Sequence, residues 1–299
     1  MTPSNEHAER FTHLRPLLFT IAYEILGSAA EAEDVLQDSY LRWAEVDLST
    51  VRDTKAYVAR LVTRQALNAR RAAARRREDY VGPWLPEPLL IAEEGDPSSD
   101  ALLAESVSMA MLIVLETLTP TERAVFVLRD VFGFDYDDIA AAVGKSVDAV
   151  RQVAHRAHEH VQARRKKFEP ASSTATKVTE QFLLATASGD VQGLMELLAP
   201  DVVWTADGGG KVSASRRPVV GADRVARIAV GLFKKGVAVP GVRAEMITCN
   251  NLPAVAFYVE DVLDLVMLVE SVDGLITNVY AVRNPDKLSA MAVPHAISR

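Results

Sequence analysis

The chain has 299 residues, of which 49% are apolar, so it is long enough for two or three domains with ordinary hydrophobic cores. Its single cysteine, Cys249, excludes an internal disulfide and a cysteine-ligated metal cluster. The sequence has no apolar run long enough to span a bilayer, and its first residues lack the apolar core of a signal peptide. We therefore expect a soluble, cytoplasmic protein without a membrane partner.

The net charge of −7 conceals a strong segregation of charge along the chain. Residues 24–47 carry seven acids and one base, residues 52–77 carry nine bases and one acid, and residues 78–122 carry ten acids and no base. Such blocks predict separate surfaces, basic ones for phosphate and acidic ones for a protein partner or for masking the basic ones.

Residues 1–78 are predicted to form an all-helical domain. Apolar residues at helical spacing begin near Leu14 and stop at Gly27, Ser28 can cap a second helix, and Asp53 or Thr54 opens a third. The second helix leaves polar side chains available at Asp34, Gln37, Asp38 and Arg42. The exposed side of the third helix carries side chains that can contact the backbone of a nucleic acid. These are Lys55, Arg60, Arg64, Asn68, Arg71 and Arg75. The alternative is an ordinary solvated, charged face.

Residues 79–100 form a predicted linker with the segment YVGPWLPEPL at its start. Its three prolines favour a stiff, extended backbone, and Trp84 with Leu85 offers an apolar anchor. Two interpretations stay open for these residues, a docking motif and a rigid spacer with a buried tryptophan.

Residues 101–168 contain a predicted helix-turn-helix. Thr119 and Pro120 start one helix, Asp135 can cap a second that Gly144 ends in the left-handed conformation, and Ser146 caps a third. In such folds the start of the last helix enters the major groove, where Arg pairs with guanine and Gln with adenine.

The third helix presents a polar face opposite its apolar stripe. The candidate DNA contacts on it are Ser146, Asp148, Arg151, Gln152, His155 and Arg156, and Arg151 and Gln152 are the best base-reading candidates. The basic tail at residues 164–167 would contact phosphates without specificity. A solvated amphipathic helix pair is the alternative.

A polar linker at residues 169–176 precedes the last predicted domain, residues 177–299. Two helices around the turn at Gly189 are followed by apolar runs that short turn signals separate, which predicts an α+β domain with a curved antiparallel sheet. We predict no metal and no cofactor for any part of the chain.

Three stretches in this order resemble extracytoplasmic-function (ECF) sigma factors, the promoter-recognition subunits of bacterial RNA polymerase. EAEDVLQDSYLRW is similar to the region 2 helix that grips the polymerase, AYVARLVTRQALNARRAAARRR to the helix that handles the minus-ten element, and LTPTERAVFVLRDVFGFDYDDIAAAVGKSVDAVRQVAHRA to region 4, which reads the minus-thirty-five element. The last domain resembles the SnoaL-like cone fold. The fold class expected is therefore multidomain, with two all-α sigma domains followed by an α+β SnoaL-like domain.

The resemblance implies a role for each group of residues. It makes Asp34, Gln37, Asp38 and Arg42 polymerase contacts, and it makes the loop at residues 47–54 part of the minus-ten site. It implies core RNA polymerase and promoter DNA as partners, a role in stress-dependent transcription, and no need for a separate anti-sigma protein. The fused domain would then regulate the sigma domains, and a ligand for it stays unknown.

The regulatory contact is expected where the linker meets two loops of the last domain. Its predicted members are Trp84, Leu85, Pro86, Asp207, Lys211, Asn284, Pro285, Asp286 and Lys287. We expect Asp207 and residues 284–287 to lie in turns, and simple chain termination is the alternative for the second. The segment DGGGK lacks the spacing of a phosphate loop.

Two other functions compete with this interpretation. A ligand-responsive repressor would use the same recognition helix without polymerase. A SnoaL-type enzyme would need acid–base groups inside the cone, for which the candidates are Asp207, Tyr258, Asp261, Asp264 and Tyr280. We do not expect the chain to be an enzyme, since Asp207 is expected in a turn and Asp261 and Asp264 lie in a run that favours solvent.

Overall fold

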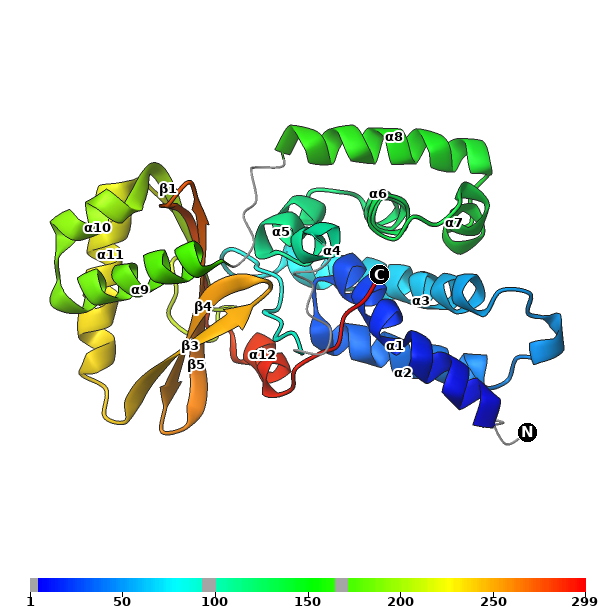
Figure 1. Ribbon diagram of the computed structural model, residues 1–299, viewed down its shortest axis with the longest axis horizontal. Coiled ribbons are helices and arrows are strands. Elements are labelled where there is room, and N and C mark those ends of the chain that lie inside the picture. Colours follow the sequence, from blue (N-terminus) through cyan, green and yellow to red (C-terminus); the bar gives the residue numbers. More distant parts are fainter. Residues whose placement is uncertain (1–4, 93–100, 165–171) are drawn as a thin grey trace. The chain divides into compact units, whose positions relative to one another are not determined.

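The computed structural model describes residues 5–92, 101–164 and 172–299, without the side chains of residues 74–78. Arg75 and residues 165–167 of the basic tail therefore lie outside the side chains that the structure describes. The chain divides into two compact units (Figure 1). The helical unit comprises Met1–Asp79, Ala92–Lys166 and His295–Arg299, and the sheet unit comprises Tyr80–Ile91 and Lys167–Pro294.

The helical unit holds both predicted helical domains. Its α-helices are α1 (Asn5–Leu26), α2 (Ala29–Trp43), α3 (Thr54–Glu78), α4 (Ala101–Ser106), α5 (Met109–Glu116), α6 (Pro120–Phe126), α7 (Tyr136–Val143) and α8 (Val147–Arg164). A short 3₁₀ helix, η1 (Leu48–Thr50), precedes α3, and a π-helical turn, η4 (Val127–Val131), continues α6.

Local sequence signals fix the ends of α2 and α3. Gly27 adopts a positive φ after α1, and the Ser28 side chain then accepts a hydrogen bond from the Glu31 amide at the start of α2. Asp53 does the same for the Ala56 amide at the start of α3. At the end of α2, Trp43 is fully buried and donates its indole N–H to the His7 carbonyl at 2.9 Å. These features position the polar face of α2 and the basic face of α3.

The helix-turn-helix forms where it was predicted. Thr119 and Glu122 make a reciprocal capping box at the start of α6, and Gly144 ends α7 with φ +69°. Asp135 occupies the N-cap position of α7 without a side-chain capping bond, whereas the Ser146 hydroxyl accepts from the Ala149 amide at the start of α8. The turn between α7 and α8 is therefore tight.

The sheet unit is an α+β domain. Its helices are α9 (Ser173–Ser188), α10 (Val191–Leu197), α11 (Ala222–Val237) and α12 (Pro285–Leu288), followed by the 3₁₀ helix η5 (Ser289–Ala292). Its strands are β1 (Leu198–Asp207), β2 (Val219–Val220), β3 (Val242–Cys249), β4 (Leu252–Val259), β5 (Val262–Val272) and β6 (Leu275–Val282). Among the described residues these strands form one sheet in the order β2-β1-β6-β5-β4-β3, in which only the β1–β6 pair is parallel.

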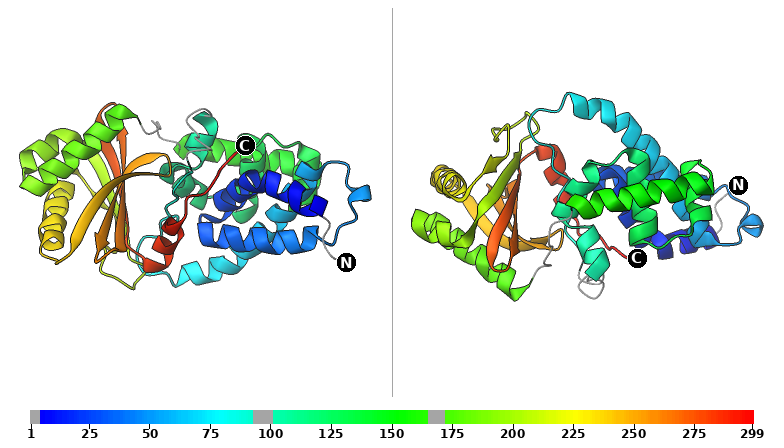
Figure 2. Two further views of the ribbon diagram at one scale, coloured as in Figure 1. Left: turned by 60° about the horizontal axis from the view of Figure 1, so that its bottom comes forward. Right: turned by 90° about the horizontal axis from the view of Figure 1, so that it is seen from above.

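One face of this sheet packs against α9, α10 and α11 (Figure 2). The core between them is apolar and includes Phe182, Trp204, Val225 and Met267. The helix α11 is missing from the sequence prediction, which had helices first and strands afterwards. Its apolar residues recur at helical spacing, with Val225, Ala229 and Val230 buried, so a helical signal was present between the two strand regions.

Two expected turns are wrong. Asp207 is the last residue of β1, where its carbonyl accepts the amides of Arg283 and Asn284. Residues 285–288 form α12, because Asn284 caps the Asp286 amide and Pro285 supplies a helical φ at the first position. No helix in the described part of the chain is long and apolar enough to cross a membrane.

Candidate functional site

The polar face of α8 is open along its length. Arg151, Gln152, His155 and Arg156 are exposed, while Val150, Val153 and Ala157 on the other side are buried. Asp148 is exposed too, and it pairs with Arg151 across one turn at 3.1 Å. Both residues of the pair lie on the solvent side, where an ion pair contributes little free energy. Another hydrogen-bond acceptor can therefore replace Asp148 as the partner of Arg151.

The basic face of α3 carries most of its predicted members. Lys55, Arg64, Asn68 and Arg71 are exposed, and Arg60 is half-buried with its guanidinium 4.8 Å from the Tyr57 ring centroid. The basic block also contains Arg70, which is 6% exposed and faces inward. The exposed basic residues of the block therefore form a surface along one side of α3, and not every arginine of the block belongs to that surface.

Part of this α3 face is in contact with α7 inside the helical unit. The Arg64 guanidinium donates to the Ala141 carbonyl at 2.6 Å, and the Lys55 ammonium lies 5.7 Å from the Phe134 ring centroid. Burial raises the pKa of Asp138 on α7, with neighbouring Asp135 and Asp53 as further causes. Two side chains predicted to contact nucleic acid are thus engaged by the helix-turn-helix.

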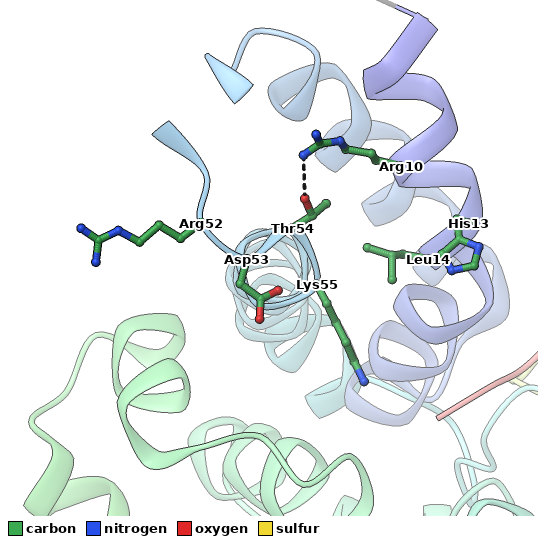
Figure 3. Close-up of a pocket in the computed structure, with 7 residues that line it drawn as sticks. All are labelled: Arg10, His13, Leu14, Arg52, Asp53, Thr54 and Lys55. Atoms are coloured by element: carbon green, nitrogen blue, oxygen red, sulfur yellow. Dashed lines mark hydrogen bonds between the residues drawn. The ribbon is translucent and has the colours of Figure 1, made fainter. Parts of the chain in front are cut away.

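An open pocket lies where α1 meets the start of α3 (Figure 3). Its volume is about 370 Å³. The lining residues are Arg10, His13, Leu14, Arg52, Asp53, Thr54 and Lys55. Arg10 donates to the Thr54 hydroxyl at 3.1 Å, which ties the two walls together. Three of these seven side chains, Arg10, Arg52 and Lys55, are cationic, and the lining includes the end of the loop that precedes α3.

The polar edge of α2 is accessible. Asp34, Gln37, Asp38 and Arg42 are all exposed, as is Leu41 between them. The first three lie on one side of the helix at spacings of three and four residues. This edge offers a hydrogen-bonding surface of mixed charge to another protein.

A buried polar network joins the helices of the helical unit. Arg123 is fully buried, and it donates to the Glu24 carbonyl at 2.5 Å and to the Glu116 carboxylate. Arg70 pairs with the same carboxylate at 3.1 Å. The Glu24 carboxyl is itself buried against the Ser106 hydroxyl at 2.6 Å, and burial raises its pKa to about 8. This network connects α1 and α3 to α5 and α6.

In the sheet unit, the Asp207 carboxylate is fully buried and accepts hydrogen bonds from the linker segment Tyr80–Ile91. The Tyr80 hydroxyl donates at 2.5 Å and the Leu85 amide at 2.8 Å. The Lys287 ammonium, on a side chain that is itself buried, completes the site at 2.7 Å. Burial, followed by the hydrogen bond to Asp207, raises the pKa of Tyr80, so the phenol stays protonated as a donor.

Lys287 and Asn284 hold the linker from the other side. The Lys287 ammonium also donates to the Leu85 carbonyl and lies 4.0 Å from the centroid of the Trp84 ring, a cation–π contact. Asn284 donates to the Tyr80 hydroxyl at 2.9 Å. Lys211 is exposed and pairs with Asp286 at 2.6 Å. The three predicted segments therefore meet around one buried ion pair.

The three glycines after Asp207 allow this close approach. A Cβ atom on Gly209 would lie 2.4 Å from the Asn284 side-chain nitrogen, and one on Gly210 would lie 3.0 Å from the Val81 side chain. Both glycines also have a positive φ. The DGGGK segment therefore forms a surface, free of side chains at its glycines, on which the linker packs.

The linker has a second attachment site, which the sequence prediction did not include. The Leu89 amide donates to the Asn250 side-chain oxygen at 2.8 Å, and the Asn250 amide donates back to the Leu89 carbonyl at 2.9 Å. Leu85, Pro86 and Leu89 are buried in this arrangement. Of the two interpretations of the linker, these contacts agree with docking.

Of the side chains considered for catalysis, Tyr258 and Asp261 share a partner, Arg243, and the others have partners of their own. Tyr280 points to the sheet face opposite the helices, where its hydroxyl donates to the buried Glu270 at 2.8 Å, and burial holds its pKa well above 10. Tyr258 stacks with Arg243, and Asp264 pairs with Arg283. Within the described residues, no group of three or more His, Cys, Asp or Glu is arranged to bind a metal.

Comparison with known proteins places these surfaces in a family. Sigma-70 region 2 matches residues 10–76, and sigma-70 region 4 matches residues 108–161. The ECF RNA polymerase sigma factor SigJ of Mycobacterium tuberculosis is 37% identical over 227 residues, which cover 75% of this chain and 72% of SigJ. The chain belongs to the ECF sigma factors.

Two further matches, one in sequence and one in structure, cover nearly the whole chain. The probable ECF sigma factor SigI of M. tuberculosis is 30% identical over 282 residues, 93% of either chain. The crystal structure of M. tuberculosis SigJ has a TM-score of 0.74 and 28% identity, and the match covers 95% of this chain and 98% of that one. The predicted fold class is confirmed as two helical sigma domains followed by an α+β domain.

This ECF sigma factor is an alternative sigma factor that directs transcription initiation with RNA polymerase at promoter DNA. Sequence reasoning missed two residues that hold the linker. Tyr80 was overlooked because a lone tyrosine at a linker's start has no local signal, and Asn250 because its role depends on a partner 161 positions away. Arg70 was left out of the predicted basic face, which agrees with its burial.

Proposed function

We propose that this sigma factor binds core RNA polymerase through the edge of α2 formed by Asp34, Gln37, Asp38 and Arg42. The observation that supports this most directly is that all four side chains are exposed on a helix inside the matched region 2. Transcription takes place in the cytoplasm, so this function also requires a cytoplasmic location.

The proposed promoter contacts divide into base reading and phosphate binding. Arg151 and Gln152 on α8 read the minus-thirty-five element, with Ser146, Asp148, His155 and Arg156 beside them. Lys55, Arg60, Arg64, Asn68, Arg71 and Arg75 on α3 follow the strands near the minus-ten element. The cationic pocket of Figure 3 accepts an unpaired nucleotide there, because its lining combines phosphate-binding cations with the loop before α3.

The sheet unit is proposed to regulate the sigma regions in cis, without a separate anti-sigma protein. What supports this is the buried ion pair of Asp207 and Lys287, which holds a linker that begins directly after α3. A change in the sheet unit that alters this ion pair would therefore act on the chain between regions 2 and 4. The helix-facing side of the sheet is filled with apolar side chains.

Run-off transcription with core polymerase tests the proposal, on a candidate promoter upstream of the protein's own operon. We expect transcripts that depend on the added sigma factor. A folded chain that neither associates with core polymerase nor supports initiation contradicts it, and binding to the same DNA without polymerase would instead favour a repressor.

A matched pair of substitutions separates the two kinds of DNA contact. Arg151→Ala should relax the preference at one base pair by about 1–3 kcal/mol, since it removes a base-edge donor. Arg71→Ala should weaken binding uniformly across sequences. It should also lower the slope of log binding constant against log salt concentration by about one released ion. Binding of promoter variants to the polymerase complex at several salt concentrations measures both effects. Identical behaviour of the two variants would contradict the assignment.

A further inference from the structure

The last five residues of the chain lie in the helical unit, although the segment before them belongs to the sheet unit. The His295 ring stacks on Phe19 of α1 with centroids 4.4 Å apart and planes at 6°. Ile297 is only 3% exposed. The His295 ring is thus anchored against region 2, and Ile297 is a second buried side chain of this short tail.

Two hydrogen bonds made by the backbone of the tail hold it on either side of Ile297. The Ser298 amide donates to the Thr20 hydroxyl at 3.3 Å, and the Ala92 amide donates to the His295 carbonyl at 2.9 Å. The His295 ring lies 3.4 Å from the Glu33 carboxylate of α2. The hydrogen bond between His295 and Glu33 is the main cause of the lowered pKa of Glu33, and Arg15 lowers this pKa further.

The tail reaches Glu33, which borders the proposed polymerase contact. Glu33 directly precedes Asp34, and Gln37 follows one turn later on the same helix. Asp34 and Gln37 are exposed and available, whereas Glu33 is already engaged by His295. A protein that covers this edge of α2 would meet the docked tail at its border.

We propose that residues 295–299 are a latch that docks on region 2 in cis and is displaced when core polymerase covers α2. The coupling to polymerase rests on the proposed function, whereas the docking itself rests on the contacts above. The latch holds the end of the chain on region 2 within the helical unit, so its release gives polymerase access to the border of α2.

Two substitutions in the full-length chain test the docking. Ile297→Asp places a charge in the buried anchor site, and Ala296→Asp places the same charge on the exposed neighbour. Hydrogen exchange at the Ala92 amide measures the result, because the acceptor of that amide is the His295 carbonyl. We expect Ile297→Asp to accelerate this exchange on the order of tenfold, with Ala296→Asp close to the wild type. Equal exchange in all three chains would overturn the latch.

Affinity for core polymerase tests the coupling. Ile297→Asp should bind on the order of tenfold more tightly than Ala296→Asp, because polymerase no longer competes with the tail. A released tail with unchanged affinity would overturn the displacement step. Asp38→Ala separates the two ideas, since an unaltered affinity in that variant would contradict the proposed polymerase edge while the exchange at Ala92 still reports the docked tail.

Discussion

At the scale of single residues, Glu24 shows how burial changes the chemistry of a carboxyl group. Its side chain is fully buried, and the desolvation that raises its pKa to about 8 outweighs the hydrogen bond from Ser106 and the charge of Arg123, both of which lower it. At neutral pH the folded chain therefore holds Glu24 protonated, as a neutral member of a network that already contains the Glu116 carboxylate.

The stability of the helical unit should consequently depend on this one proton. An unfolded glutamate titrates near 4.3, so from about pH 4.5 to about pH 8 the folded chain alone binds the proton, and stability falls as pH rises through this window. The loss can reach about 1.4 kcal/mol per pH unit. Glu24→Gln should flatten the fall and leave the variant more stable than the wild type at pH 8.

Thermal unfolding midpoints between pH 5 and pH 8.5 measure this difference. Glu45→Gln is the matched control, because Glu45 is an exposed glutamate of the same region. If the unfolding midpoints of Glu24→Gln and Glu45→Gln depend on pH in the same way, burial of Glu24 does not cause the fall of stability with pH.

At the scale of elements, the docked linker depends on the Asp207 carboxylate. Asp207→Asn keeps the shape of the side chain but removes the charge opposite the buried Lys287 and replaces one acceptor oxygen with a donor amide. Removing one partner of a buried ion pair costs about 3–5 kcal/mol. We therefore expect the Leu85 amide to exchange its hydrogen at least 100-fold faster, and promoter-dependent transcription to change as the linker is released.

Asp264→Asn provides the comparison for this prediction. Asp264 pairs with Arg283 at a half-exposed position of the same sheet unit, so its substitution should leave the Leu85 amide protected. Equal protection of Leu85 in both variants would mean that the ion pair does not hold the linker.

The elements of this chain differ in how far the sequence could predict them. The helix-turn-helix was predictable because Thr119, Gly144 and Ser146 act on neighbouring residues, and local capping decides where helices start and end. Asp207 was assigned to a turn because three glycines follow it, whereas the buried cation that makes it an ion-pair site is 80 positions away. Contacts of that range leave no local pattern.

At the scale of the whole molecule, the charge blocks that the sequence shows have two different uses. Arg70 from the basic block and Glu116 from the acidic block that follows form a buried pair, so part of the segregation serves packing. The exposed remainder, on α2 and α3, keeps the proposed protein and nucleic-acid surfaces separate on a chain whose net charge is −7. Net charge therefore says little about the partners of this sigma factor.

The contact between α3 and α7 implies that regions 2 and 4 separate on a promoter. Minus-ten and minus-thirty-five elements roughly 25 base pairs apart are separated by about 85 Å at about 3.4 Å per base pair. In this structure Arg64 of α3 instead hydrogen-bonds the Ala141 carbonyl of α7 at 2.6 Å. Helices in direct contact cannot occupy both elements at once, so the state described here is closed and must open when both elements are bound.

Fluorescence transfer between labelled cysteines can follow this opening, since the single native cysteine, Cys249, is buried. Labels at Glu9→Cys in region 2 and Glu159→Cys in region 4, both exposed positions, should show efficient transfer in the free chain. Core polymerase with promoter DNA should abolish most of that transfer, because the distance grows toward the spacing of the two elements. A pair within region 2, Glu9→Cys with Glu45→Cys, should keep its transfer throughout. High transfer from the first pair in an initiation-competent complex would contradict the opening.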